Sequence, residues 1–494
     1  MDWNKLQNGS DIRGVALEGI EGESVNLTNE VTTALAQAFV AWLGEKNGKT
    51  AQIIAVGSDS RLSSPTLRQA FADGAAAAGA TVLNFGMAST PAMFMATVDE
   101  QLHADGAVMV TASHLPWNRN GLKFFTAKGG LEKADIARIL ELAPQFMGAE
   151  KKGNGEVKAV DFMATYCDIL VNYIRRGVNN GDQPLQGMHI IVDAGNGAGG
   201  FFANKVLKSL GADTTGSQFL EPDGHFPNHI PNPENKEAMA SICKAVVEHK
   251  ADLGIIFDTD VDRSAIVDRT GTSINRNALI ALISAVILRE HPGSTIVTDS
   301  VTSDGLAKFI ADRNGKHHRF RRGYKNVINE SLRLNANGEE SWLAIETSGH
   351  AALRENYFLD DGAYLVAKLI VEAACLRKEG KELQDLIADL QQPAESKEIR
   401  FKIDTNDFKA YGEQVLEHIK MAAEKEQDWQ LVSPNYEGVR IACKGEEEQG
   451  WFLLRQSLHD PVLPLNIESN VEGGVNRITE RVLNLLSDFK ALKQ

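Results

Sequence analysis

Three aspartates at alternate positions are the clearest chemical feature of the chain. Asp258, Asp260 and Asp262 stand in the segment Asp-Thr-Asp-Val-Asp-Arg, directly after the apolar residues 254–257. Mg²⁺ prefers carboxylate oxygens and usually keeps a coordination position for a phosphate oxygen or water. The segment is not an EF-hand calcium loop, because Arg263 stands where that loop needs glycine. We therefore expect a magnesium site beside a phosphate group rather than three solvated loop acids.

Ser113 is a candidate nucleophile at the end of another apolar segment. Ser113 and His114 follow residues 108–110, and the amine of Lys123 is near enough along the chain to reach the same loop. A serine hydroxyl is a weak nucleophile until a base or a metal ion activates it. Because a lone serine at a strand end more often caps a helix, this interpretation depends on what else the chain supplies.

A glycine-rich segment at residues 195–200 reads Gly-Asn-Gly-Ala-Gly-Gly and fits G-x-G-x-x-G. A dinucleotide site also needs an acidic residue at the end of the next strand. Only Glu221 and Asp223 are available, with Pro222 between them. We therefore expect a tight turn rather than a nucleotide site.

The composition is that of a globular protein with several domains. The chain has 494 residues, of which 43% are hydrophobic and 24% charged, so about three or four domains are expected. The net charge of −15 excludes a general nucleic-acid binder, which needs a basic surface. The same charge repels anions, so an anionic substrate requires a local cationic pocket.

The cysteines and the N-terminal residues predict a cytoplasmic protein. Cys167, Cys243, Cys375 and Cys443 lie far apart, so we expect reduced, buried thiols rather than a zinc cluster or redox pair. Residues 1–5 resemble neither a signal nor a transit peptide, and no apolar run is long enough to span a bilayer. We expect a monomer or small homo-oligomer without a membrane or nucleic-acid partner.

Helices and strands must alternate to position these residues. Thr28 can cap a helix with one buried apolar face, and Ser64 and Thr90, each followed by proline, can cap two more. This β-α-β-α-β order predicts a mostly parallel sheet. The strands are expected at residues 52–56, 81–85 and 107–110.

Apolar strands run into polar loops in three pairs, which predicts three α/β units of related design. Ligands of open α/β sheets lie beyond the carboxyl ends of the strands, so the chemistry is expected in these loops. The strand segments are residues 53–56 and 108–110, then 190–192 and 254–257, then 295–297 and 343–345.

The last hundred or so residues follow an α+β pattern. Asn476 is expected to cap an amphipathic helix over residues 477–492, and residues 445–450 form a hairpin turn between two strands. The strands are expected at residues 397–403, 438–443 and 451–455. Polar stretches at the boundaries predict domains at residues 1–154, 155–272, 273–393 and 394–494.

Taken together, the motifs resemble the phosphoglucomutase/phosphomannomutase branch of the α-D-phosphohexomutase superfamily along essentially the whole chain. The resemblance implies three related mixed α/β domains around an active-site cleft, plus a smaller C-terminal α+β domain. Residues 11–14 and 56–65 also resemble the family's N-terminal segments. The four main motifs, in the family's order, are residues 111–116 (phosphoserine loop), 258–263 (magnesium loop), 346–350 (sugar-binding loop) and 455–461 (phosphate-binding loop).

The resemblance implies a role for each matching residue. Ser113, followed by His114, is the implied phosphoserine, and its phosphoryl group shares Mg²⁺ with the three aspartates. The implied groups for proton and charge transfer are Arg13, Lys123 and His350; those for the sugar are Glu346 and Ser348; those for the distal phosphate are Arg455, Ser457 and His459; Arg263 and Lys325 also face the substrate.

The implied reaction interconverts the 1- and 6-phosphates of glucose or mannose through a bound hexose 1,6-bisphosphate. The form Glu-x-Ser-Gly-His at residues 346–350 resembles this branch rather than the aminosugar branch. Two alternatives stay open. The Asp258 segment also resembles the nucleophile loop of haloacid-dehalogenase phosphatases, and the chain could be a non-catalytic binder of sugar phosphates.

The sequence departs from the family's usual pattern at three places. His459-Asp460 stands where Thr-Glu is frequent, Ile345 where many members have glycine, and Ser10 where many have a larger residue. The charge of histidine varies near neutral pH, so we expect the affinity for the distal phosphate to depend on pH. The departures concern the preferred sugar, not the reaction class.

Overall fold

The structure is a computed structural model that describes residues 2–148, 153–457 and 460–493. It divides into two compact units, which are described separately. The first comprises Met1–Leu279 and Ser348–Asp385, and the second Ile280–Thr347 and Leu386–Gln494. No described helix is both long enough and apolar enough to cross a membrane.

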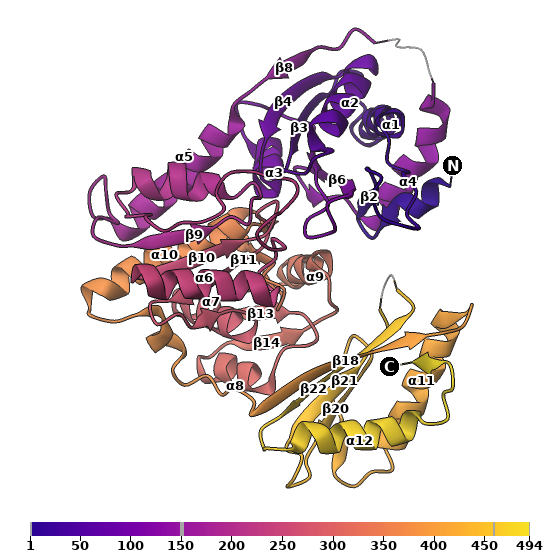
Figure 1. The fold of residues 1–494 in the computed structure, drawn as a ribbon, viewed down its shortest axis with the longest axis vertical. Helices are drawn as coiled ribbons and strands as arrows, with labels where there is room; N and C mark the ends of the chain where they lie inside the picture. The colour runs from indigo at the N-terminus through magenta and orange to yellow at the C-terminus, as the bar shows by residue number, and fades with distance from the viewer. Residues whose placement is uncertain (1, 149–152, 458–459, 494) are drawn as a thin grey trace. The chain divides into compact units, whose positions relative to one another are not determined.

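The N-terminal part of the first unit is a sheet with helices on both faces (Figure 1). Its strands are β1 (Gln7–Asn8), β2 (Asp11–Val15), β3 (Ile53–Ser58), β4 (Thr81–Met87), β5 (Gly106–Val110), β6 (Arg119–Thr126), β7 (Gly129–Gly130) and β8 (Val157–Ala159). Its helices are η1 (Trp3–Leu6), α1 (Asn29–Asn47), α2 (Ser64–Ala77), α3 (Thr90–Val98), α4 (Lys133–Leu142) and η2 (Ala143–Phe146).

The strand order in this sheet is β1-β2-β6-β5-β3-β4-β8, with β7 beside β6. The strands β5, β3 and β4 are parallel, as predicted, and β8, which the sequence analysis did not predict, adds a fourth parallel strand. The strands β1, β2, β6 and β7 pair antiparallel, so the sheet is mixed rather than mostly parallel. The antiparallel return of β6 brings Lys123 beside β5, whose end leads into the Ser113 loop.

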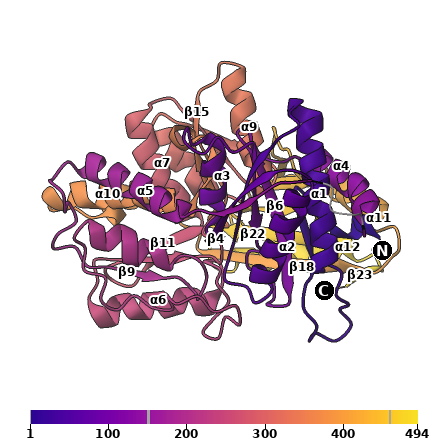
Figure 2. The ribbon, with the colours of Figure 1, turned by 90° about the horizontal axis from the view of Figure 1, so that it is seen from above.

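One face of β6 packs in the hydrophobic core, and the other face carries the candidate site residue Lys123. Phe124 packs against Phe39 and Phe71 of α1 and α2, with ring centroids 4.9 and 6.3 Å away, and these helices lie side by side (Figure 2). Successive strand residues point to opposite faces. Lys123 therefore shares the face of Phe125, which meets Phe94 of α3.

One predicted helix cap is confirmed and two are wrong. The Thr28 hydroxyl accepts a hydrogen bond from the Val31 amide at the start of α1. Ser64 and Thr90, however, are the first residues of their helices. Their hydroxyls cap no helix and instead donate to the buried carboxylates of Asp59 and Asp260 at 2.7 and 2.6 Å. The residues at the N-cap positions are Ser63 and Ser89.

The rest of the first unit contains a second sheet, in the order β12-β11-β10-β9, and a short hairpin. The strands are β9 (Ile190–Asp193), β10 (Leu253–Phe257), β11 (Ser264–Asp268), β12 (Ser273–Ile274), β16 (Ala351–Leu353) and β17 (Leu359–Asp360). The helices are α5 (Phe162–Val178), η3 (Phe202–Leu207), α6 (Lys236–His249), η4 (Arg354–Asn356) and α10 (Gly362–Lys378). The strands β9 and β10 are parallel, and β10 ends at the Asp258 segment.

The glycine-rich segment after β9 forms a tight turn, as predicted. Gly195 and Asn196 have φ of 54° and 61°, in the left-handed region. A Cβ on Gly197 would lie 2.7 Å from the carbonyl oxygen of Thr259. The glycine is needed because the turn packs directly on the backbone of the Asp258 segment.

The second unit contains the parallel strands β14-β13-β15 and the C-terminal sheet, ordered β19-β20-β21-β22-β18-β23. The strands are β13 (Thr295–Thr298), β14 (Lys316–Arg319), β15 (Ser341–Ile345), β18 (Glu395–Ile403), β19 (Trp429–Leu431), β20 (Val439–Cys443), β21 (Gly450–Leu454), β22 (Val462–Ser469) and β23 (Leu492–Lys493). The helices are α8 (Asp304–Asp312), α9 (Tyr324–Ala336), α11 (Phe408–Ala423) and α12 (Gly474–Leu486); α7 (Asn277–Glu290) and η5 (Leu383–Ile387) run across the boundary between the units.

The predicted cap of the last helix is also wrong. α12 starts two residues before Asn476, after Gly473, which has φ of 76°. The Glu395 carboxylate on β18 accepts the amides of Gly473 and Val475 at 2.8 and 3.1 Å. The free amides at the start of α12 are therefore bound by a side chain from a strand distant in sequence, which local sequence patterns cannot indicate.

The mixed α/β sheets and the C-terminal α+β sheet confirm the expected fold class. The four cysteines are free thiols, of which only Cys167 and Cys443 are buried. The expectation that all four are buried is wrong for Cys243 and Cys375, which are half-exposed. The four domain boundaries and the cytoplasmic location stay predictions.

Replacing Phe124 with alanine is expected to lower the free energy of unfolding by about 3–5 kcal/mol, because it empties the centre of the aromatic core. Urea unfolding measures the change. The matched control is Met147→Ala, since Met147 is 44% exposed and its loss should change stability by less than about 0.5 kcal/mol. Equal effects of the two substitutions would contradict the assigned core.

Candidate active site

The Ser113 loop begins where β5 ends and is held in a strained conformation. Ser113 has φ of 51°, in the left-handed region, which costs free energy for a residue other than glycine. Its amide donates to the Thr111 hydroxyl at 3.0 Å, and its carbonyl oxygen accepts from Thr259 at 2.8 Å. The surrounding contacts therefore fix a backbone that the loop alone would not adopt.

A buried arginine holds the same loop from beneath. The guanidinium of Arg61 donates to the carbonyl oxygens of Leu115, Pro116 and Arg119 at 2.6, 2.8 and 3.0 Å, and also to that of Ser113. Arginine has five donors in a fixed planar arrangement, so one side chain can hold several carbonyls at once. Arg61 is therefore a positioning residue for the loop.

Asp59 completes this support. Its carboxylate lies 3.4 Å from the Arg61 Nε and accepts hydrogen bonds from Thr111 and Ser64 at 2.8 and 2.7 Å. Asp59 and Arg61 belong to the segment resembling the family's N-terminal motif, but the sequence analysis gave them no role. Both residues follow β3 in the same strand-to-loop pattern as Ser113, and this pattern could have marked them as candidate site residues.

The Ser113 hydroxyl lies between a carboxylate and a guanidinium. It donates to Asp258 Oδ2 at 3.0 Å and accepts from Arg263 Nη2. The same Arg263 nitrogen donates to His114 Nδ1. Burial and then Arg263 lower the pKa of His114 to about 2, so the imidazole is neutral and Nδ1 is an acceptor.

The three aspartates of the 258–262 segment are all buried and lie together, with ligand oxygens within 4.8 Å of one another. Lys123 Nζ contacts Asp260 Oδ2 at 3.1 Å and also Asp262 Oδ2. The Oδ1 atoms of Asp260 and Asp262 are buried but accept no hydrogen bond. Buried carboxylate oxygens without a hydrogen bond are costly, so this set fits a hard cation such as Mg²⁺.

The pKa values within this segment move apart. Burial, followed by the charges of Asp262 and Asp260, raises the pKa of Asp258. Burial also opposes ionisation of Asp262, but Lys123, His350 and Arg263 outweigh it and lower its pKa. Lys123, His350 and Arg263 thus stabilise the charged form of Asp262 most strongly, whereas burial and the neighbouring carboxylates disfavour the charged form of Asp258.

His350 joins the same group from the β16–β17 hairpin. Its Nδ1 lies 2.6 Å from Asp360 Oδ2 and 3.8 Å from Asp262 Oδ1. Burial would lower the pKa of His350, but Asp360 and Asp262 raise it to about 9. His350 is therefore a cation at neutral pH, and Asp360 is a further site residue that the sequence analysis missed.

The other predicted residue of the first unit near this group is Arg13. It pairs with Asp11 at 3.1 Å and is close enough to disfavour the protonated form of His114. Ser348, in the sugar-binding loop, has a buried hydroxyl without a hydrogen-bond partner.

The structure gathers seven predicted residues around Ser113: His114, Lys123, Asp258, Asp260, Asp262, Arg263 and His350.

The remaining predicted residues belong to the second unit. Glu346 follows β15, is 4% exposed and accepts the Gly323 amide at 2.6 Å. Ile345 ends β15 as a buried strand residue, so the departure from glycine is accommodated there. Lys325 is half-buried in the first turn of α9. Arg455 and Ser457 follow β21, whereas His459 lies outside the described residues.

The basic run at residues 316–322 is largely paired within the second unit. Arg319 contacts Asp304 at 2.8 Å, His318 contacts Glu330 at 2.9 Å, and Arg322 lies 3.4 Å from Asp299. The run is therefore an ion-paired edge strand for most of its length, and it is not a solvated basic patch.

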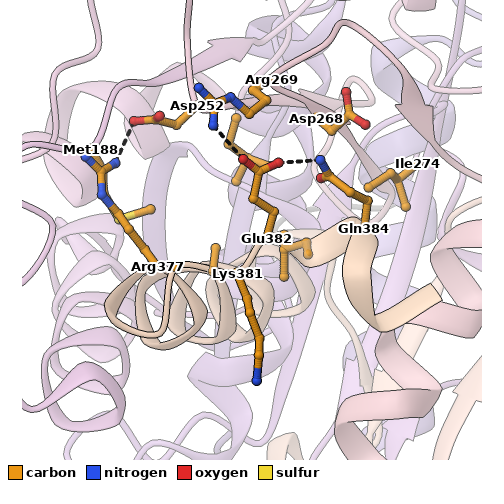
Figure 3. Close-up of a pocket in the computed structure, with 13 residues that line it drawn as sticks. Met188, Asp252, Asp268, Arg269, Ile274, Arg377, Lys381, Glu382 and Gln384 are labelled. Carbon is orange, nitrogen blue, oxygen red and sulfur yellow. Dashed lines mark hydrogen bonds and ion pairs between the residues drawn. The ribbon is translucent and has the colours of Figure 1, made fainter. Parts of the chain in front are cut away.

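A separate cavity of about 320 Å³ opens elsewhere in the first unit (Figure 3). Its arginines are paired: Arg377 with Asp252 at 2.8 Å, and Arg269 with Glu382. Gln384 also donates to Glu382. None of the predicted site residues lines the cavity, and it offers an anion no excess positive charge.

Comparisons with known proteins find relatives along nearly the whole chain. The family description "Phosphoglucomutase/phosphomannomutase, alpha/beta/alpha" matches as domain I at residues 4–145, domain II at 164–271 and domain III at 275–394. A phosphomannomutase of Escherichia coli is 32% identical and a phosphoglucomutase of Neisseria gonorrhoeae 30% identical; these alignments cover 96% and 94% of this chain, and 98% and 94% of theirs. A solved phosphoglucomutase/phosphomannomutase family protein of Burkholderia thailandensis has a TM-score of 0.78 at 25% identity, over 98% of each chain.

Replacing Arg61 with methionine is expected to loosen residues 111–119, because four carbonyl oxygens lose their donor, each at a cost of about 1–3 kcal/mol where buried. Faster amide hydrogen exchange in that segment measures the effect. The control is Arg138→Met, since Arg138 is an exposed helix residue paired with Glu45 and Glu141. Unchanged exchange in the Arg61 variant would rule out the positioning role.

Proposed function

Because the chain belongs to the phosphoglucomutase/phosphomannomutase family of isomerases, we propose that it interconverts the 1- and 6-phosphates of glucose or mannose. In this proposal Ser113 carries the phosphoryl group, and a bound hexose 1,6-bisphosphate is the intermediate. The observation that carries the proposal is the Ser113 hydroxyl, buried between Asp258 and Arg263 and next to two further aspartates.

Asp258, Asp260, Asp262 and the phosphoryl group on Ser113 are the proposed ligands of Mg²⁺. The buried Oδ1 atoms of Asp260 and Asp262, which accept no hydrogen bond, support this assignment. Bound magnesium neutralises charge on the phosphoryl group in transfer. A magnesium ion would also balance the carboxylates that the local cations leave uncompensated.

The chain's own cations are proposed to stabilise the group in transfer. In one direction the bond between phosphorus and the Ser113 oxygen breaks and a bond to a sugar hydroxyl oxygen forms. The proton that this hydroxyl loses ends on the freed Ser113 oxygen, which becomes a hydroxyl again. Arg263 already donates to the Ser113 oxygen, so it can stabilise the charge that develops there. Lys123, Arg13 and His350 are the proposed groups for the proton and the remaining charge, with His114 a neutral acceptor beside the serine.

The sugar and the distal phosphate are assigned to the remaining predicted residues. Glu346 and Ser348 are proposed to hold ring hydroxyls. Arg455, Ser457 and His459 are proposed to bind the non-transferring phosphate, with Lys325 facing the substrate. Supporting this, Arg455 is a largely buried guanidinium, 7% exposed, in a protein of net charge −15, where an anionic ligand needs such a local cation.

The phosphatase alternative is disfavoured by the surroundings of Asp258. Its Oδ1 accepts the Arg263 amide at 3.1 Å, and its Oδ2 accepts Ser113 and the Arg263 Nε at 3.0 and 3.2 Å. Asp258 is 0% exposed. Both oxygens are thus engaged, as in an acceptor or metal ligand rather than an attacking nucleophile.

Incubation with glucose 1,6-bisphosphate and Mg²⁺ is expected to place one phosphate on Ser113, detected by mass spectrometry of tryptic peptides. Ser113→Ala is expected to lose the modification and to lower the mutase rate by about 10³-fold or more, since it removes the nucleophile. Chelating Mg²⁺ should abolish turnover. An unmodified Ser113 together with an acyl phosphate on Asp258 would instead support the phosphatase.

Initial rates with glucose, mannose and N-acetylglucosamine 1-phosphates are expected to favour the first two by about tenfold or more in kcat/KM. If Glu346 and Ser348 hold ring hydroxyls, as proposed, replacing one hydroxyl with the bulky N-acetyl group costs more than inverting it in an epimer. A preference for the aminosugar would refute the assignment to this branch. No conversion of any of the three would support the non-catalytic alternative.

A further inference from the structure

Glu437 lies in a tight turn directly against the backbone of Arg455. A Cβ on the next residue, Gly438, would lie 2.2 Å from the Leu454 carbonyl oxygen and 2.8 Å from the Arg455 Cα, and Gly438 has φ of 59°. Asn435 fixes the turn, since its amide donates to the carbonyls of Glu437 and Gly438 at 3.0 and 2.9 Å. The position of the Glu437 side chain is therefore set by the fold.

Three kinds of donor face the Glu437 carboxylate. The Ser300 hydroxyl and the Arg322 amide both donate to its Oε2, the latter at 3.2 Å. The Arg455 Nη1 lies 3.9 Å from its Oε1. A hydroxyl, a backbone amide and a guanidinium are the groups with which proteins bind phosphate oxygens. The carboxylate thus occupies surroundings suited to an anion.

The Arg455 guanidinium is close to this carboxylate without being hydrogen-bonded to it. It donates no hydrogen bond to any described residue, and its Nε is buried without a partner. Its side chain is 8% exposed and that of Glu437 9%. Burial lowers the pKa of Arg455, and Glu437 opposes this change. The carboxylate therefore compensates the charge of Arg455 but leaves its donors available for another anion.

We propose that Glu437 is an internal anion that competes with the substrate's non-transferring phosphate for Arg455. The identity of that phosphate rests on the proposed function, whereas the competition rests on the contacts above. A phosphate dianion brings more charge and more acceptor oxygens than one carboxylate, so it can take over the guanidinium. A weaker anion cannot, because it also meets the repulsion of Glu437. Glu437 thus makes the site selective for phosphate and keeps its affinity moderate, which favours release of product.

The test is the affinity of the intact protein for inorganic phosphate, measured by calorimetry. Glu437→Gln keeps the side-chain shape and an acceptor oxygen for Ser300 and the Arg322 amide. It is expected to bind phosphate about tenfold more tightly, because the competing charge is removed. Glu426→Gln is the matched control: it changes the net charge equally, but Glu426 pairs with Arg481, and its phosphate affinity should stay at the wild-type value.

The Arg455→Met background identifies where the phosphate binds. In that background Glu437→Gln should produce no gain, because the guanidinium in question is absent. Equal or weaker binding by Glu437→Gln alone would overturn the proposal, and so would a gain that persists without Arg455. Phosphate binding needs no turnover, so a gain in a protein that isomerises no hexose phosphate would uphold this inference and refute the proposed function.

Discussion

The buried carboxylates of Asp258, Asp260 and Asp262 are the constraint on which the rest of the site depends. Taking such charges out of water is costly unless cations and donors compensate them. Lys123, Arg263 and His350 supply three positive charges to this group, whereas it holds four buried acids once Asp360 is counted, so carboxylates remain in excess. The residues around them supply positive charge or hydrogen bonds that compensate these carboxylates. The Ser113 hydroxyl contacts the group through Asp258.

Several ordinary structural devices are used here to support the site. Thr90 sits where a helix cap was predicted, but its hydroxyl donates to Asp260. The glycine-rich turn after β9 resembles a nucleotide-binding loop, but Gly197 packs on Thr259. Thr259 in turn donates to the Ser113 carbonyl oxygen. Local patterns that usually mark caps and cofactor loops thus connect the Asp258 segment to the Ser113 loop.

The second unit shows the complementary arrangement. Here a buried cation, Arg455, is accompanied by a carboxylate, Glu437, whose distance allows attraction but no hydrogen bond. In a protein with a net charge of −15, anion sites have to be created locally. Each unit therefore holds buried charges beside groups of opposite charge: the aspartates near Ser113 lie beside Lys123 and Arg263, and the guanidinium of Arg455 lies beside Glu437.

The sequence alone determined the features that are local. Neighbouring residues were enough to predict the strands followed by polar loops, the Thr28 cap and the cluster of three aspartates. The order of the motifs was enough to indicate the family. The tertiary structure decided which distant groups meet these loops. Arg61 reaches the carbonyls beyond Ser113, Asp360 pairs with His350, and Glu437 faces Ser300. The partners in these contacts are far apart along the chain, and only the packing of strands and helices in the folded protein brings them together. Hydrophobic periodicity and short motifs describe neighbouring residues, so they cannot predict such contacts.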